Sequence, residues 1–313
     1  MNETVISVRN LKKAYRNQQV LDGLSFDVRR GSIFALLGEN GAGKTTTVRI
    51  LSTLIQADDG VAMIAGYDTK TEANHVRRKI SLTGQYAAVD ELLTGEENLA
   101  MMGRLNHLDK ELIAKRTAEL LETFELTKAA RKKVKTYSGG MRRRLDIAIS
   151  LLAAPEVIFL DEPTTGLDPR SRRKMWDMIK LLANQGVTIF LTTQYLEEAD
   201  QLADKIAIIA EGKIIKEGTA EELKEVIGEE TLELTFADTS GYHEAQNYMS
   251  GEVDKEARKI SIPIRSVRQL RELLNDLYVK GIEPDAIVIR QPTLDDVFIK
   301  MTEHNKVEVL VNG

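Results

Sequence analysis

The chain has 313 residues, a length that favours one large and one small domain over a single domain. Its net charge of −5 and its pI near 5.6 provide no overall basic field, so we expect no nucleic-acid partner. The absence of cysteine excludes a disulfide framework and a thiolate metal site. The N-terminus lacks a signal-peptide pattern, and the longest apolar stretch, residues 147–160, is interrupted by Pro155 and Glu156. We therefore expect a cytoplasmic protein whose role at a membrane would depend on a partner.

Residues 5–30 are expected to form short antiparallel strands. Apolar and polar residues alternate there until the turn at Arg30-Gly31. This pattern predicts an antiparallel β edge ahead of the next segment. Tyr15 lies within it and has two equally ordinary uses, stacking on a nucleotide base or lying half-buried in a strand.

The next segment combines an apolar run at residues 33–37, a glycine-rich loop and a helical pattern. The loop fits the spacing glycine, four residues, Gly-Lys-Thr, in which backbone N–H groups and a helix N-terminus can surround a phosphate chain. Lys44 would reach the β and γ phosphates, and the Thr45 hydroxyl would bind a magnesium ion. We therefore predict a nucleotide phosphate site rather than an accidental glycine turn. Its residues are Gly38, Glu39, Asn40, Gly41, Ala42, Gly43, Lys44, Thr45 and Thr46.

Residues 80–83 predict a short strand that ends near Gln85. The Gln85 amide at the carboxyl edge of a strand could bind a magnesium ion or an attacking water, although this residue alone is better interpreted as a solvated loop residue. Residues 90–150 then carry long helical patterns, at 111–125 and 142–153, and no convincing strand. They predict a helical subdomain inserted into an α/β core.

Ser138, Gly139 and Gly140 stand just before the second of these helices, which is expected to begin at Arg142. Ser138 can cap the helix, and the glycines leave backbone N–H groups uncovered, which would make a second anion site. Taken alone, the motif is better interpreted as a serine cap with glycines in a turn. The arginine run 142–144 is interpreted as a solvated helix face rather than a nucleic-acid patch.

Two carboxylates follow a buried strand expected at residues 157–160. Because ligands of open α/β sheets gather at the carboxyl ends of strands, Asp161 is expected to hold the hydration shell of a magnesium ion. Glu162 is expected to orient or deprotonate the water that attacks the γ phosphate. Adjacent acids directly after four apolar residues are costly unless they are engaged, which favours this interpretation over a plain exit from the strand. Another buried strand, 187–191, is followed by Gln194.

Six motifs in this order resemble those of the ATP-binding subunits of ABC transporters. They are GENGAGKTT (38–46), Gln85, YSGGM (137–141), VIFLDEP (157–163), GLDP (166–169) and TTQYLEEAD (192–200). The resemblance covers about the first 220 residues. It implies an α/β P-loop NTPase core with an antiparallel β edge and a helical subdomain at about 86–150, and it implies binding and hydrolysis of ATP with Mg²⁺.

The resemblance also implies a head-to-tail homodimer. Lys44 and its loop would hold ATP on one chain, and residues 138–140 of the partner subunit would close over the γ phosphate. Tyr15 occupies the position that stacks on adenine, and Gln85 lies in the loop that binds magnesium and couples the subunits. Asp168 falls in the loop that crosses the dimer interface.

Two of the motifs depart from the family pattern. The signature usually reads LSGGQ, so Tyr137 and Met141 are substitutions, but the Ser-Gly-Gly centre is intact. The switch position usually holds histidine and here holds Gln194, which can hydrogen-bond a γ phosphate but cannot become positively charged. Hydrolysis is still expected because Glu162 is present.

Residues 230–313 predict a small α+β domain. Strands are expected at 232–236, 259–264 and 286–289, a further strand near Val253, and helices at 240–250 and around 270–277. This order suggests a ferredoxin-like unit. No catalytic constellation is visible in it.

Its Pro-Thr-Leu-Asp-Asp-Val-Phe run (292–298), with YSGGM and TTQYLEEAD, resembles the daunorubicin-resistance type of drug-exporter ATPase. This resemblance implies a separately encoded polytopic membrane subunit, a place on the inner face of the cell membrane and export of a drug-like or hydrophobic compound. Related ATPases export lipids, polysaccharides or ions. A soluble ABC ATPase acting on ribosomes or DNA is the alternative, but a single phosphate loop and the lack of sustained heptads favour the exporter.

Overall fold

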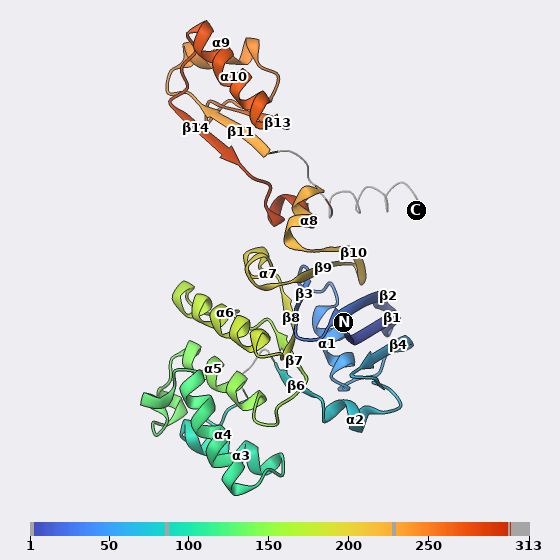
Figure 1. Ribbon diagram of the computed structural model, residues 1–313. Helices are drawn as coiled ribbons and strands as arrows, with labels where there is room; N and C mark the ends of the chain where they lie inside the picture. Colours follow the sequence, from blue (N-terminus) through green and yellow to red (C-terminus); the bar gives the residue numbers. More distant parts are fainter. Residues whose placement is uncertain (1–2, 85–87, 227–229, 300, 302–313) are drawn as a thin grey trace. The chain divides into compact units, whose positions relative to one another are not determined.

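The computed structural model describes residues 3–84, 88–226, 230–299 and 301. The chain divides into two compact units, Met1–Ala220 and Glu221–Gly313 (Figure 1). Each unit has its own sheets and its own hydrophobic core. Helix α8 (Ala220–Glu225) begins at the boundary between them.

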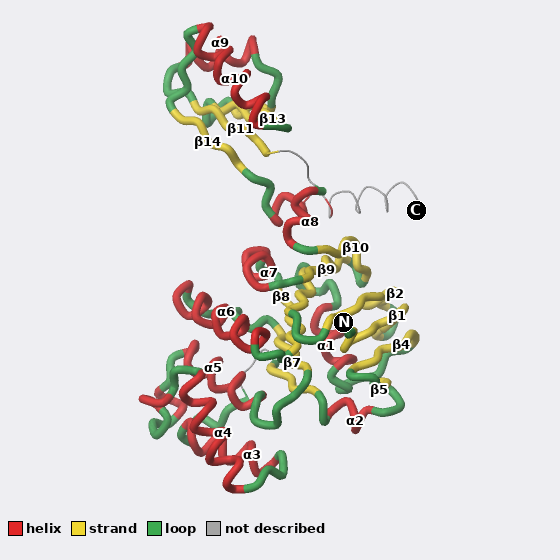
Figure 2. Tube along the Cα trace, viewed as in Figure 1, coloured by secondary structure: helices red, strands yellow, loops and turns green. Residues whose placement is uncertain are grey.

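The first unit is organised around a six-stranded sheet, whose strands are drawn in yellow in Figure 2. Its strand order is β10-β9-β3-β8-β7-β6, and neighbouring strands are parallel except for β9 and β10. Its strands are β3 (Ile33–Leu37), β6 (Ile80–Thr83), β7 (Val157–Asp161), β8 (Thr188–Thr193), β9 (Lys205–Ala210) and β10 (Lys213–Gly218). Every residue of β3, β7 and β8 is buried, as expected for the centre of a covered parallel sheet. Because these three strands are parallel, the segments that follow them leave the same edge of the sheet.

A second, four-stranded antiparallel sheet has the order β2-β1-β4-β5. Its strands are β1 (Thr4–Tyr15), β2 (Gln18–Arg29), β4 (Asp59–Ile64) and β5 (Tyr67–Asp68). The predicted antiparallel strands are therefore confirmed, and they form a sheet of their own beside the parallel one. Phe34 of β3 stacks on Phe26 of β2 at 5.2 Å and on Phe190 of β8 at 5.4 Å, so the two sheets share one core.

The predicted helical insertion is confirmed: the structure gives no β-strand in residues 88–150. Its helices are α3 (Gly95–Leu105), α4 (Lys110–Thr123) and α5 (Gly139–Ser150), with short 3-10 turns at Thr127–Ala129 and Val134–Thr136. Thr94 and Glu97 form a capping box that fixes the start of α3. Helix α5 begins three residues earlier than predicted, because the Ser138 hydroxyl accepts the Met141 N–H and starts the helix at Gly139.

Four further helices complete this unit: α1 (Lys44–Leu51), α2 (Ala73–Arg77), α6 (Pro169–Asn184) and α7 (Leu196–Leu202). Helix α6 has Asp168 as its N-cap and Pro169 in its first turn, both favourable signals for a helix start. It buries Met175, Ile179 and Leu182, which recur at helical spacing and anchor it in the core.

The second unit has the element order β11 (Glu230–Thr235), α9 (Thr239–Tyr248), β12 (Glu252–Asp254), β13 (Lys259–Ile264), α10 (Val267–Lys280) and β14 (Ala286–Arg290). Its antiparallel sheet has the order β12-β13-β11-β14. This is the predicted ferredoxin-like arrangement, including the short strand that contains Val253. Apolar residues of β11 and β13 pack with α9 and α10, and Leu232, Leu234 and Ile260 are fully buried there.

Candidate active site

The phosphate loop runs from the end of β3 to the start of α1. Gly43 has φ 109°, and a Cβ on it would lie 2.5 Å from Leu21 Cδ2. A Cβ on Gly38 would lie 2.4 Å from the carbonyl oxygen of Ile209. Glycine is therefore required at both positions by the surrounding packing. The Gly38 N–H donates to Thr193 O at 3.2 Å, which joins the loop to the end of β8.

Lys44 points back over the loop that precedes it. Its Nζ donates to the carbonyl oxygens of Gly38 at 2.8 Å and Glu39 at 3.0 Å, and it lies 3.6 Å from Glu162 Oε1. The side chain is only 4% exposed, and burial lowers the pKa of Lys44 while the carboxylate of Glu162 opposes that shift. The buried ammonium is thus held between loop carbonyls and a carboxylate, at the start of α1, where a phosphate is also favoured.

Asp161 and Glu162 lie at the carboxyl end of β7, as the sequence predicted. Asp161 Oδ1 accepts hydrogen bonds from Thr192 Oγ1 at 2.5 Å and from Thr45 Oγ1 at 3.3 Å. Glu162 has φ 49°, in the left-handed region that is uncommon for residues other than glycine. Its N–H donates to both the carbonyl and the hydroxyl oxygen of Thr192, which stabilises this conformation. Strained backbone of this kind concentrates at functional sites.

The donor set around Thr45 fits a magnesium ion. The Thr45 hydroxyl and the Asp161 carboxylate are hard oxygen ligands on adjacent elements, and Mg²⁺ binds through one or two such groups together with waters and phosphates. In the part of the chain that the structure describes, no group of three or more histidine, aspartate or glutamate residues could hold a metal. A magnesium ion here would therefore depend on the phosphates of its nucleotide.

A second cluster joins the start of α5 to the start of α6. Ser138 caps α5, and a Cβ on Gly140 would lie 2.8 Å from Ser171 Oγ. Asp168 accepts from the Ser171 N–H at 2.9 Å and from its hydroxyl at 2.6 Å, and these hydrogen bonds lower the pKa of Asp168. Gly139, between the cap and Gly140, is the first residue of α5. Two of the predicted site segments, 138–140 and 168, are thus brought side by side.

No hydrogen bond or ion pair found among the described residues joins this second cluster to the phosphate loop. Tyr15 ends β1 and is 44% exposed, and Lys13 Nζ lies 5.6 Å from the centre of its ring. Gln194 follows β8 and is half-buried. Gln85 lies outside the described residues. The structure therefore brings Lys44, Thr45, Asp161 and Glu162 together with the loop carbonyls of Gly38 and Glu39, and it gathers the turn at 138–140 and Asp168 into a second cluster.

Tyr137 is a structural residue. It is buried, and its hydroxyl donates to Ala129 O at 2.8 Å. A Cβ on Gly95 would lie 2.5 Å from the same hydroxyl, so Gly95 makes room for the phenol. The tyrosine before the Ser-Gly-Gly turn is thus bonded to the 3-10 turn at Thr127–Ala129 and packs against the start of α3.

The interpretation of residues 142–144 as a solvated helix face is wrong for Arg143. This arginine is 7% exposed, whereas Arg142 and Arg144 are partly exposed. Sequence analysis also missed Thr192, whose hydroxyl donates to Asp161. Thr192 lies one residue before the end of β8, and its contact with Asp161 depends on β8 lying beside β7, so no local signal identified it; the charge of Arg143 likewise gave no sign of its burial.

Glu198 is a fully buried acid next to this region. Its Oε1 accepts from Thr164 Oγ1 at 2.6 Å and from Trp176 Nε1 at 3.1 Å. Burial raises the pKa of Glu198, and the two hydrogen bonds oppose the shift. Folding therefore favours its protonated form, and the contribution of Glu198 to stability is lost as the pH rises through its raised folded-state pKa.

We predict that Glu198→Gln, which mimics the protonated acid, gains thermal stability relative to the unchanged chain as the pH rises from 5 to 8. The difference in Tm between the two chains should be small at pH 5 and largest at pH 8. Glu197→Gln, an exposed change on the same helix, is the control and should show no such trend. Equal differences at both pH values for Glu198→Gln would contradict the prediction.

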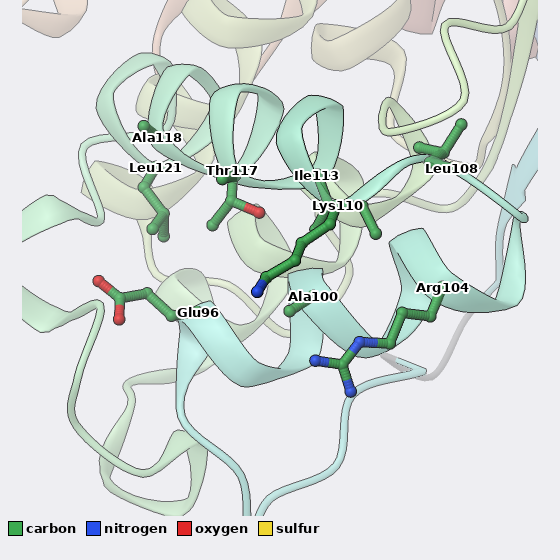
Figure 3. A pocket seen from close by; sticks show the side chains of 10 residues that line it. Glu96, Ala100, Arg104, Leu108, Lys110, Ile113, Thr117, Ala118 and Leu121 are labelled. Atoms are coloured by element: carbon green, nitrogen blue, oxygen red, sulfur yellow. The ribbon is translucent and has the colours of Figure 1, made fainter.

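A cavity of about 520 Å³ lies between α3 and α4, apart from the residues of the candidate site (Figure 3). Its apolar wall includes Ala100, Ile113 and Leu121, and the side chains of Arg104 and Lys110 stand at its rim. Neither cation forms an ion pair within the described residues.

No helix in the described part of the chain is long and apolar enough to cross a membrane.

Comparison with known proteins agrees with this geometry. Residues 21–165 match the ABC transporter family, and residues 218–302 match the C-terminal domain of DrrA1-3-like ATP-binding proteins. The chain is 46% identical to the daunorubicin/doxorubicin resistance ATP-binding protein DrrA of Streptomyces peucetius, over 96% of this chain and 92% of that protein. It belongs to the ABC transporter ATP-binding proteins. As a member of this family, the chain binds and hydrolyses ATP.

Other relatives of this ABC ATP-binding protein extend the comparison. It is 46% identical to the doxorubicin resistance ATP-binding protein DrrA of Mycobacterium tuberculosis, over 96% of this chain and 94% of that one. It is 34% identical to the linearmycin resistance ATP-binding protein LnrL of Bacillus subtilis, over 95% and 98%. A solved dimeric ATP-binding cassette in a post-hydrolysis state with ADP and Pi matches with a TM-score of 0.62 at 25% identity, covering 68% of this chain and 98% of that one.

Proposed function

We propose that this ABC ATP-binding protein powers the export of a drug-like or hydrophobic compound through a separately encoded membrane subunit. The observation that carries the proposal is the cluster of Lys44, Thr45, Asp161 and Glu162 at one sheet edge, in a chain whose relatives are named for resistance to daunorubicin and doxorubicin. The chain would lie on the inner face of the cell membrane, bound to that subunit.

Within the ATP site, each side chain has a distinct task. Lys44 would exchange its loop carbonyls for the β and γ phosphates, which are stronger acceptors. Thr45 and Asp161 would bind Mg²⁺, which would neutralise phosphate charge when present. Glu162 would orient the attacking water and accept its proton. Gln194, half-buried after β8, would donate a hydrogen bond toward the γ phosphate.

We further propose that two chains share each ATP. Lys44 and Thr45 are joined by direct contacts to Asp161 and Glu162, whereas the turn at 138–140 makes no such contact with them. This separation is expected if the turn, with its uncovered N–H groups, serves the nucleotide of a second copy. The dimeric cassette described above is a precedent for such pairing. Tyr15, with its exposed ring, would stack on the adenine.

The test is a pull-down of tagged Glu162→Gln chain, in the presence of ATP, from gently solubilised native cells. Recovery of a polytopic membrane protein would support the exporter. Recovery of ribosomal proteins or DNA without a membrane partner would overturn it. Deleting the gene for the recovered subunit and measuring growth inhibition by a panel of hydrophobic antibiotics would then identify the class of compound.

The cavity between α3 and α4 is the surface that we propose for the membrane subunit. Its apolar wall suits an apolar helix, and the rim cations Arg104 and Lys110 suit an acidic residue on that helix. Glu96, also on the rim, lies 3.7 Å from Arg131 in an ion pair of its own. The occupant is therefore expected to be an amphipathic helix with a carboxylate.

We predict that Ala118→Trp, which fills this cavity, removes most of the membrane subunit from the pull-down while the isolated chain keeps its ATP affinity. Ala118 lines the cavity and is exposed, so the indole should not disturb the core. Leu112→Trp is the matched control, because Leu112 is exposed on the same helix but does not line the cavity. Equal recovery of the subunit with both variants would show that the subunit binds elsewhere.

A further inference from the structure

Arg143 lies at the start of the second turn of α5, close to the Ser-Gly-Gly turn, and its guanidinium is buried. A buried guanidinium is costly unless its donors are satisfied, so its partners show what it holds in place. Nε donates to Pro163 O at 3.0 Å and Nη2 donates to Asp161 O at 3.3 Å. Asp161 and Pro163 are the residues on either side of Glu162.

Glu162, the residue between Asp161 and Pro163, has a strained backbone conformation. Glu162 has φ 49°, and the orientation of its carboxylate depends on the peptide groups that flank it. The guanidinium binds the carbonyl of the 161–162 peptide, which precedes Glu162, and the carbonyl of the 163–164 peptide, one residue beyond it, so it restrains the backbone on both sides of Glu162. A lysine ammonium is a point charge and cannot reproduce that fork.

Arg143 also binds the segment that follows β6. Nη1 donates to Gly84 O at 2.5 Å and to Asp146 Oδ2 at 3.3 Å. Asp146 is buried one turn further along α5, and its Oδ1 accepts the Ala88 N–H at 2.9 Å. The Arg143–Asp146 pair therefore joins α5 to the carboxyl ends of β6 and β7. These strand ends lie at the edge of the sheet that carries the candidate site.

We propose that Arg143 is a positioning residue that couples the turn at 138–140 to the backbone carrying Glu162. Helix α5 begins with that turn, and Arg143, on the same helix, binds the backbone carbonyls of Asp161 and Pro163, the two chain neighbours of Glu162. A displacement of the turn by a bound γ phosphate is thus transmitted to the hydrolytic carboxylate of the same chain. This coupling rests on the proposed dimer, in which the turn serves one ATP and Glu162 serves the other.

The test compares Arg143→Lys with Arg144→Lys in the full chain. Arg144 is the matched control because it is the next residue of α5 and donates to Phe124 O at 2.9 Å, within the helical insertion. For Arg143→Lys we expect kcat to fall at least about 10-fold and the Hill coefficient for ATP to fall toward 1. The affinity for ATP in the absence of hydrolysis should stay close to that of the unchanged chain, and the variant should stay folded at the assay temperature although the lost buried hydrogen bonds lower its Tm. Arg144→Lys should retain both kcat and cooperativity.

A control separates this inference from the proposed dimer. The Glu162→Gln chain is first tested for ATP-dependent dimer formation by size-exclusion chromatography with light scattering. If no dimer forms, the proposal that two chains share each ATP is wrong, and the coupling through Arg143 is overturned as well. If the dimer forms and Arg143→Lys keeps the kcat and Hill coefficient of the unchanged chain, the coupling alone is overturned. A fall in kcat matched by a fall in the folded fraction would likewise assign Arg143 a purely structural role.

Discussion

Replacing Glu162 by glutamine is expected to lower kcat for ATP hydrolysis by about 100- to 1,000-fold, since a positioned general base contributes on this scale. Glutamine has the shape of glutamate, so the left-handed backbone and the contacts of its N–H to Thr192 should persist. The amide cannot accept the proton of the attacking water. Affinity for ATP should be maintained or increased, because a negative charge 3.6 Å from Lys44 is removed.

The measurement is steady-state phosphate release, with nucleotide binding determined separately by calorimetry. Glu156→Gln provides the control, because Glu156 precedes the other end of β7 and pairs with Arg30 and Lys79, both at 2.6 Å. Glu156→Gln should leave kcat within about 2-fold of that of the unchanged chain and lower Tm by no more than about 4 °C, because partly exposed ion pairs contribute little to stability. Phosphate release by Glu162→Gln at the rate of the unchanged chain would remove Glu162 from the mechanism.

The acidic pair and the phosphate loop could be predicted because their signals are local. A run of apolar residues predicts each strand, and ligands of open α/β sheets gather at the carboxyl ends of strands, so the sequence alone predicts that the phosphate loop and Asp161 serve one site. Ser138 was likewise identified as a cap from its position before two glycines. The helix start was still misplaced by three residues, because the glycines were assigned to the turn although the cap already holds them in α5.

Arg143 could not be predicted because its role depends on contacts distant in sequence. Its partners come from residues 84, 161 and 163, and three consecutive arginines give the same pattern whether they face solvent or the core. The hydrogen bond from Thr192 to Asp161 could not be predicted for the same reason, because it forms only when β8 lies beside β7 in the sheet. Local patterns thus identified the groups that act on the phosphates, whereas the groups that orient them emerged only from the packed structure.

Replacing Lys44 by methionine is expected to weaken ATP binding about 10- to 100-fold, the loss for one charge-assisted hydrogen-bonded contact. Methionine is unbranched and apolar, so it can occupy the space of the buried lysine stem. Burial lowers the pKa of Lys44, because removing the charged ammonium from water costs free energy. Removing that charge should therefore leave Tm unchanged or raise it.

This combination of lost binding and retained stability distinguishes a phosphate ligand from a structural ion pair. If Lys44 served only to neutralise Glu162, methionine would leave that carboxylate without its cation, and stability would fall while ATP still bound. Calorimetric titration with ATP and thermal unfolding of the same variant decide between the two roles. Arg49→Met, an exposed change on the same helix, should alter neither quantity and serves as the matched control. Unchanged affinity for ATP in Lys44→Met would exclude the phosphate role, because no other lysine lies in this loop.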